Sequence, residues 1–297
     1  MVRAKRRTGW GEAATGGAGR KPGRSLNPPG TAQSRREFPF WLLAAILLGL
    51  LFAWLIAANG DYAIIFHALR QGVLTTLWVS IVAYALAVTV GLVVALGRRS
   101  RLRAVREVAT FYVEIVRGIP TLVLLFYVAF VGAPAIVVAW NWVLAVPIAY
   151  GLFPGLTISG FDMTWRAIFA LTISYSAFLS EIFRAGIESV PKVQVEGAQA
   201  LGLGRFTTFR FVVLPQAIRT VLPPLGNDFV AMIKDSALVS SLGVQDITQL
   251  GKVYSASTFL FFETYNVVAY LYLVMTIGLS LMVRALEARL KRHGGTG

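Results

Sequence analysis

Long apolar runs constrain the fold of this chain more than any other feature of its sequence. The first run, FWLLAAILLGLLFAWLIAA, occupies residues 40–58, and further runs of similar hydropathy follow it. About 20 apolar residues are enough to cross the hydrocarbon core of a bilayer as a helix, which bonds every backbone polar group internally. Charged residues make up 14% of the 297 residues, compared with about 25% in soluble domains. The sequence therefore predicts an all-α integral membrane protein, built as a polytopic helical bundle.

About six membrane-spanning helices are expected from the positions of these runs. They are predicted at residues 40–58, 72–96, 108–133, 167–187, 216–240 and 264–284. Residues 134–160 are also mostly apolar, but Pro134, Pro147 and Pro154 interrupt them, so that they either span or lie as a broken helix on one face. With this segment kept outside, most Lys and Arg residues fall on one side, as the positive-inside rule favours. We therefore predict six spans with both termini in the cytoplasm.

The two ends of the chain differ from its apolar centre. Residues 1–39 are rich in Arg, Gly and Pro and hold almost no large apolar side chains, so we expect a basic, disordered cytoplasmic tail. Residues 40–58 are predicted to be an extra N-terminal span. A cleaved signal peptide is the alternative, but the tail is too long for one and the apolar run exceeds about 7–15 residues. Residues 287–297 are predicted to be a cytoplasmic C-terminal tail.

Composition excludes several kinds of site. The net charge of +14 is compatible with nucleic-acid binding, but basic clusters beside apolar spans are typical of cytoplasmic loops, so no nucleic acid is expected as a partner. A nucleic-acid or membrane-surface role for the basic tail alone stays open. With no cysteine and two histidines, no metal site is expected. Trp140 and Trp142 are expected to be interfacial anchors rather than a ligand cage.

A polar stretch with turn residues interrupts the apolar pattern at residues 191–215. Pro191 suits the first turn of a helix, helical spacing continues to Leu201, and Gly202 is placed to end that helix in a left-handed conformation. A second short helix can follow through RFTTFRFVV until Pro215 ends or bends it. Two short exposed helices at an angle, fixed at both ends to spans, make a shape that can plug a groove on another protein.

This stretch, EGAQALGLGRFTTFRFVVLP, resembles the cytoplasmic signature of bacterial ATP-binding-cassette (ABC) importer permeases. The pattern is E-x-A, three residues, Gly, nine residues, an aliphatic residue, any residue and Leu-Pro. The residues that fill it are Glu196, Gly197, Ala198, Gly202, Val212, Leu214 and Pro215. Gly197 stands where the family usually has Ala, and Val212 where it usually has Ile. TTLWVSIVAYALAVTVG, YVEIVRGIPTLVLLFYVAF and SEIFRAGIESVPKVQVEGAQALGL look like the polar amino-acid (histidine/glutamine-type) branch, and the likeness covers about residues 72–286.

The resemblance implies a type I ABC importer permease fold in a bacterial cytoplasmic membrane. In such importers a cytoplasmic coupling-helix loop, here about residues 189–215, docks into a separate ATPase subunit. The expected partners are two ATPase subunits, a second permease subunit that is identical or homologous, an extracytoplasmic solute-binding protein and membrane lipid. The chain has no G-x-x-x-x-G-K-[ST] loop to hold phosphates. No cofactor is therefore expected on this chain, with ATP and Mg²⁺ on the partner ATPase, and the chain is not expected to be an enzyme.

Ionisable residues inside predicted spans are costly and often mark function. Glu114 with Arg117, and Glu181 with Arg184, are each spaced i, i+3 and lie on one helix face. A third group falls in the predicted span that contains Pro223 and Pro224, which we expect to be broken there. Its members are Asn227, Lys234, Asp235 and Ser236. All eight are candidates for a translocation path or gate; alternatively, each acid of the two pairs simply neutralises its neighbouring base.

The predicted function is that of the membrane-spanning permease subunit of an ATP-driven importer. Polar amino acids or similar small solutes would cross by alternating access. The main alternative is a secondary transporter driven by an ion gradient, which predicts inverted internal repeats that the sequence does not display. An intramembrane enzyme is a further alternative, but the lack of cysteines and the two histidines leave few residues for a nucleophile–base pair or a metal.

Overall fold

The computed structural model describes residues 40–292. The predicted tail at 1–39 and residues 293–297 lie outside the described part. Every element within residues 40–292 is helical and no strand occurs there, which confirms the all-α class. The predicted C-terminal tail from residue 287 begins inside a helix, because the last helix continues to Arg292.

The first two helices meet at a single residue. Helix α1 covers Phe40–Ala58, and α2 covers Gly60–Arg98. Asn59 caps α2 by accepting a hydrogen bond on its side-chain oxygen from the Asp61 backbone N–H, at 3.0 Å. Helix α2 thus begins twelve residues before the predicted span at 72–96. At 1.5 Å per residue it is about 58 Å long, far more than the ~30 Å hydrocarbon core.

The predicted span at 108–133 is wrong as one continuous helix. Helix α3 covers Arg103–Gly118, and α4 begins again at Thr121 and ends at Tyr127. Between them Ile119 is extended, with φ −99° and ψ 132°. A residue that precedes proline is driven out of the helical region by the proline ring, and Pro120 follows here.

Two other prolines are accommodated inside long helical segments by a wider turn. Helix α4 continues through the π-helical turn η1 (Val128–Gly132) into α5 (Ala133–Val143), and Pro134 lies in the first turn of α5. Helix α9 (Arg205–Thr208) likewise continues through the π-helical turn η2 (Phe209–Val213) into α10 (Leu214–Asp235), with Pro215 in its first turn. Proline lacks an N–H and clashes with the carbonyl four residues earlier. A π turn relieves both problems, so Pro215 does not end the helix.

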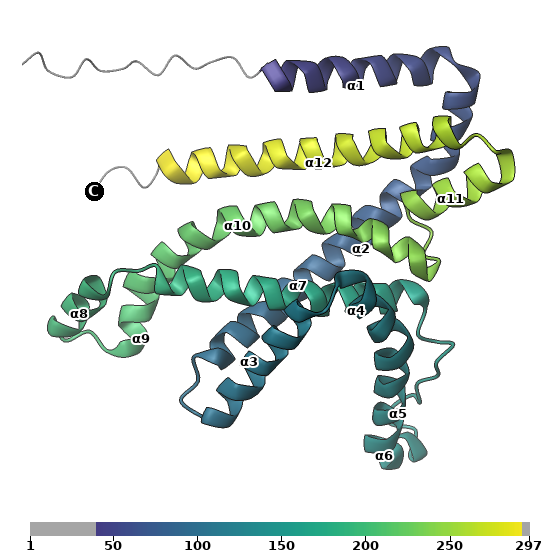
Figure 1. Ribbon diagram of the computed structural model, residues 1–297. Helices are drawn as coiled ribbons and strands as arrows, with labels where there is room; N and C mark the ends of the chain where they lie inside the picture. Colours follow the sequence, from purple (N-terminus) through teal and green to yellow (C-terminus); the bar gives the residue numbers. More distant parts are fainter. Residues whose placement is uncertain (1–39, 293–297) are drawn as a thin grey trace, which may run out of the picture. The chain divides into compact units, whose positions relative to one another are not determined.

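Helix α7 (Met163–Glu188) is the centre of the bundle. Its most extensive contact is with α2, and α10, α3 and α4 also pack against it (Figure 1). Helices α2 and α7 approach closely at Gly91, where an added Cβ would lie 2.9 Å from the Ser176 carbonyl oxygen. The core at this contact includes Val79, Ala83, Ala87, Ile168 and Leu171, all fully buried. Small residues that permit close backbone approach are typical of helix contacts in membranes.

The C-terminal part of the chain completes the bundle. Helix α10 gives way to the 3₁₀ helix η3 (Ser236–Leu242), which ends at Gly243 with φ +82°. Helix α11 (Ile247–Thr258) packs on α2, and α12 (Phe261–Arg292) packs on α10 and α11. The predicted break at Pro223 and Pro224 is wrong, because α10 is helical through both prolines. The change of helix type comes instead at Ser236.

Four helical segments of residues 40–292 are long and apolar enough to cross a membrane. They are α2, the continuous segment Thr121–Val143, α7 and α12, and residues Leu42–Ala58 of α1 form a shorter apolar helix. Helix α10 does not meet this criterion, although it packs between α7 and α12. Its polar residues therefore need neighbours other than lipid.

Candidate functional site

The loop between α7 and α10 ends its first short helix at the glycine predicted from sequence. Helix α8 covers Lys192–Ala200, and Gly202 follows it with φ +82°. The Leu203 N–H donates to the Ala198 carbonyl at 3.1 Å, and the Gly202 N–H donates to the Gln199 carbonyl at 2.9 Å. These two bonds form a Schellman motif, which requires a left-handed residue and so favours glycine. The predicted end of the first short helix is confirmed.

The signature residues lie on both sides of this turn, on α8 and at the start of α10. Ala198 is buried, whereas Glu196, Gly197 and Gly202 are exposed on the α8 side. On the other side Val212 is half-buried, and Leu214 and Pro215 are exposed where α10 begins. Their coupling role stays a prediction.

A hydrogen bond between two glutamines connects α8 to α10. Gln216 on α10 donates from Nε2 to Oε1 of Gln194 on α8 at 2.6 Å, and also to the Val212 carbonyl at 2.8 Å. Sequence reasoning missed Gln216, because nothing in the linear pattern places the first turn of α10 beside α8. This bond links α8 directly to the start of α10.

Large apolar side chains cover the outside of this loop. Val193, Leu201, Phe206 and Phe211 are each between 68% and 84% exposed, and we call these four residues the loop patch. Charged residues alternate with them, and the Arg210 guanidinium lies over the Phe211 ring, 5.8 Å from its centroid. An exposed apolar patch rimmed by charge is typical of a protein-binding surface.

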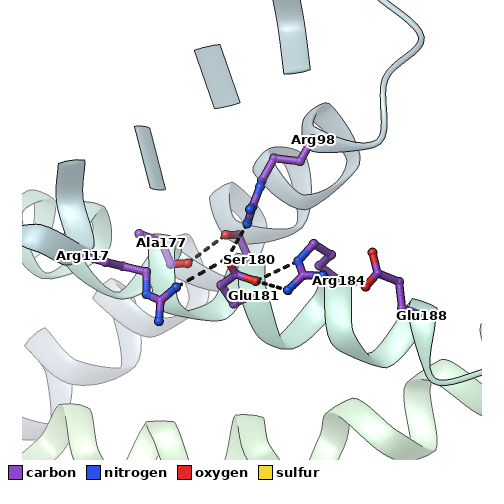
Figure 2. A network of polar contacts seen from close by, with 7 residues as sticks. All are labelled: Arg98, Arg117, Ala177, Ser180, Glu181, Arg184 and Glu188. Atoms are coloured by element: carbon purple, nitrogen blue, oxygen red, sulfur yellow. Dashed lines mark hydrogen bonds and ion pairs between the residues drawn. The ribbon is translucent and has the colours of Figure 1, made fainter. Parts of the chain in front are cut away.

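An ion-pair network lies where α7 approaches this loop (Figure 2). Glu181 is its centre: one carboxylate oxygen accepts from Arg98 at 2.6 Å and from Arg117 at 3.4 Å, and the other accepts from Arg184 at 2.7 Å. Arg184 also donates to Glu188 at 2.6 Å. The ends of α2, α3 and α7 therefore meet at one carboxylate, whose side chain is only 20% exposed.

The network differs in part from the predicted pairs. Glu181 and Arg184 do pair, but Glu114 makes no ion pair with any described residue, and Arg117 reaches across to Glu181 instead. Helix α3 ends at Gly118, so Arg117 sits at its last turn and can extend beyond it. Arg98 was missed as a member, since the sequence places it among the other basic residues of GRRSRLRAVRE.

The four candidates on α10 and η3 do not converge on one pocket. Asp235 accepts a hydrogen bond from the Tyr175 hydroxyl of α7 at 2.8 Å, and Ser236 is buried and donates to the Ile233 carbonyl at 2.7 Å. Asn227 and Lys234 are exposed on the surface of this chain. Tyr175 was missed from sequence, because a tyrosine in an apolar helix gives no signal of its partner.

The fold and the site together define a class: a polytopic helical membrane protein with an exposed apolar loop at one end of its central helix. Residues 87–292 match the family described as "Binding-protein-dependent transport system inner membrane component". The chain belongs to this family, and it is accordingly the permease subunit of an ABC importer. The type I permease fold predicted from the signature is confirmed, and the ion-gradient alternative is not favoured.

Similar proteins of known name cover most of the chain. The glutamine transport system permease protein GlnP of Escherichia coli (strain K12) is 34% identical over 223 residues, which are 75% of this chain and 93% of GlnP. The probable glutamine ABC transporter permease protein GlnM of Bacillus subtilis (strain 168) is 35% identical over 227 residues, 76% of this chain and 95% of GlnM. The probable amino-acid permease protein YxeN of the same organism is 33% identical, over 76% of this chain and 93% of YxeN.

Solved structures show the same fold. A chain from the crystal structure of an amino acid ABC transporter with histidines is 33% identical, with a TM-score of 0.64, and the match covers 77% of this chain and 95% of that chain. A chain of the MetNI methionine ABC transporter, in an inward-facing conformation, is 14% identical with a TM-score of 0.55 and shows the fold alone.

Proposed function

We propose that the loop patch is the surface through which an ATPase subunit drives this permease. The observation that carries the proposal is the exposure of Val193, Leu201, Phe206 and Phe211 on a loop whose shape is fixed by Gly202 and the glutamine pair. Because α7 and α10 enter and leave the loop directly, a force on the patch acts on both helices. Since the sequence has no phosphate-binding loop, this chain itself hydrolyses no ATP.

We also propose that the transported solute is an amino acid or a similar small polar molecule. GlnP, GlnM and YxeN carry amino-acid or glutamine permease names, and the chain matches more than nine-tenths of each. Helix α10 offers both signs of charge, from Asp228, Lys234 and Asp235, as a zwitterion requires. The four candidates on α10 and η3, together with the ion-pair network, are the proposed path and gate.

A second permease subunit, identical or homologous, is part of the same proposal. Asn227 and Lys234 are exposed on a helix that packs inside the bundle on its other faces. Such side chains are costly against lipid, so they face a water-filled path or another subunit. Two ATPase subunits, with ATP and Mg²⁺, and an extracytoplasmic solute-binding protein complete the assembly. Both termini and the loop at 189–215 lie on the cytoplasmic side.

Copurification from the native membrane tests the coupling surface. The native chain should retain an ATPase subunit, and Leu201→Asp should lose it, because Leu201 is the most exposed residue of the loop patch. Ala256→Asp adds the same charge at an exposed position of α11 and should retain the ATPase. A folded Leu201→Asp variant that keeps its ATPase in full, or a native chain that binds none, would overturn the proposal.

A further inference from the structure

A second exposed apolar region extends from the end of η1 to the start of α7. It consists of residues 133–161, which comprise α5, the short helix α6 (Ala145–Ala149) and the segment that returns to α7; we call it the arm. Helix α4 and η1 pack on α7, but α5 packs on η1 and α6 and leads away from α7 (Figure 1). Sequence left two alternatives for residues 134–160, a span or a broken helix on one face, and α5 and α6 are two separate helices with Leu144 between them.

The arm exposes large apolar side chains and carries no charge. Between Arg117 and Asp162 the sequence contains no Asp, Glu, Lys, Arg or His. Five side chains in the arm are each between 66% and 80% exposed: Trp142, Val143, Val146, Tyr150 and Leu152. A surface of this kind is unfavourable in water. A soluble protein that docked here would find no charged rim of the kind that protein interfaces use for orientation.

Two side chains of α5 hold the return segment of the arm in place. Asn141 donates from Nδ2 to the Leu156 carbonyl at 2.8 Å and accepts from the Leu156 N–H at 2.9 Å, which holds the return segment against α5. The Trp140 ring lies edge-on to that of Phe153, with centroids 6.5 Å apart. Backbone groups that enter lipid must be bonded internally, and the Asn141 side chain bonds both backbone groups of Leu156.

A buried arginine anchors the arm to α7. Arg166, only 7% exposed, donates to the Ile158 carbonyl at 2.6 Å, to the Phe161 carbonyl at 2.8 Å and to the Ala129 carbonyl at 3.4 Å. Its guanidinium therefore binds η1, just before the arm, and the last residues of the arm. The two ends of the arm are fixed, and its apolar side chains face outward.

We propose that the arm lies in the lipid interface of the bilayer leaflet at the end of α7 opposite the loop patch. The arm follows directly on α4 and η1, where Phe126, Tyr127 and Phe130 are also exposed. Trp142 and Tyr150 supply the amphipathic rings that are enriched at membrane boundaries. The arm is thus an interfacial element that is inserted sideways and fixes the depth and rotation of α7 in the bilayer.

Quenching of a single fluorescent label tests this placement. The chain has no cysteine, so Tyr150→Cys can be labelled with bimane at one position only. The full chain is reconstituted into vesicles of phosphatidylethanolamine and phosphatidylglycerol. Nitroxide lipids with a shallow spin label probe the interface, and iodide probes water. Leu201→Cys in the loop patch is the matched aqueous control, and Val123→Cys on the exposed face of α4 is the control in the span.

The two quenchers are expected to rank the Tyr150 and Leu201 labels in opposite orders. Shallow nitroxide should quench the Tyr150 label several-fold more than the Leu201 label, and iodide should quench the Leu201 label more. Equal access of iodide to both labels would overturn the proposal. Protection of the Tyr150 label that arises only when a solute-binding protein or a second permease is added would overturn it too, in favour of a protein interface. If Tyr150→Cys does not fold, Leu152→Cys carries the same test with the same outcomes.

Discussion

The loop patch and the arm expose apolar side chains to a similar extent, yet their surroundings differ. Lys192, Glu196, Arg205 and Arg210 alternate with the loop patch, whereas the arm has no charge at all. Exposure alone therefore does not identify a partner. The charge around an apolar surface distinguishes a protein groove reached through water from a lipid leaflet.

Helix α7 connects these two regions and anchors each by a different chemistry. At the loop end, Glu181 balances three arginines, while at the arm end Arg166 binds neutral carbonyls. At 1.5 Å per residue the 26-residue helix separates its ends by about 39 Å. Changes at one anchor should therefore affect one region and leave the other largely unchanged.

The largest effect is expected from Glu181→Gln. Removing this carboxylate leaves Arg98 and Arg117 without an ion-pair partner among the described residues and Arg184 with Glu188 alone. Breaking a mostly buried ion pair costs about 3 kcal/mol. The thermal unfolding midpoint of the detergent-solubilised chain should fall. Labels in the loop patch should become more mobile, while quenching at Tyr150 stays as in the native chain.

Glu114→Gln is the matched control, because Glu114 makes no ion pair with the described residues. Its effect on the unfolding free energy should stay within about 0.5 kcal/mol. Equal losses in the two variants would mean that the network does not stabilise the meeting point of α2, α3 and α7.

Arg166→Met should destabilise the protein less than Glu181→Gln, and its effect should fall on the arm rather than on the loop. The variant removes the charged donor from three carbonyls, and hydrogen bonds to charged groups contribute about 1.5–3 kcal/mol. Hydrogen exchange should accelerate at residues 150–161 and stay unchanged in α8. Arg70→Met, at an exposed position of α2, is the control and should change neither region. Faster exchange in α8 would contradict the separation of the two anchors.

The parts of this fold that sequence predicts well are those with local causes. Gly202 ends α8 because a left-handed position follows from one residue, and the apolar runs locate α2, α7 and α12 because hydropathy acts over one helix. The break before Pro120 and the continuity through Pro134 and Pro215 were not predictable in the same way. The chain can become extended before a proline, or it can stay helical through a π turn, and packing decides between the two.

Sequence indicated several of the residues that belong to the site, but not which residues they contact. Glu181 and Arg184 pair because they share a helix turn, so sequence spacing suffices. Arg98 and Arg117 join them from two other helices, and no spacing rule reports such a contact. Arg166 was not among the predicted site residues, since its partners are backbone carbonyls that sequence composition cannot identify.

Replacing either of two glycines in the loop should change the stability of α8, in opposite directions, and leave the arm unchanged. Gly202→Ala should destabilise the end of α8 by about 1–2 kcal/mol, because φ +82° is unfavourable for a residue with a Cβ. Gly197→Ala should stabilise α8 by up to about 1 kcal/mol, because Gly197 is helical and an added Cβ meets no atom within 4 Å. Hydrogen exchange of α8 measures both. Effects of the same sign, or any change in the exchange of the arm, would contradict this assignment.

The smallest effect is expected at the junction of the arm with α7, where Asp162 caps the helix. Its carboxylate accepts from the Thr164 N–H at 3.3 Å, and hydrogen bonds from Thr164 hold the pKa of Asp162 below its usual value. A lowered pKa in the folded state means that the stabilisation is present above the usual pKa of aspartate and is lost as the pH falls through the lowered value. Asp162→Ala should cost about 0.5–1 kcal/mol at neutral pH. Asp162→Asn keeps an acceptor without titrating, so its cap should persist in acid. If the native chain and Asp162→Asn lose protection of the first turn of α7 at the same pH, the cap does not depend on the carboxylate, and Arg166 alone holds the arm to this end of the helix.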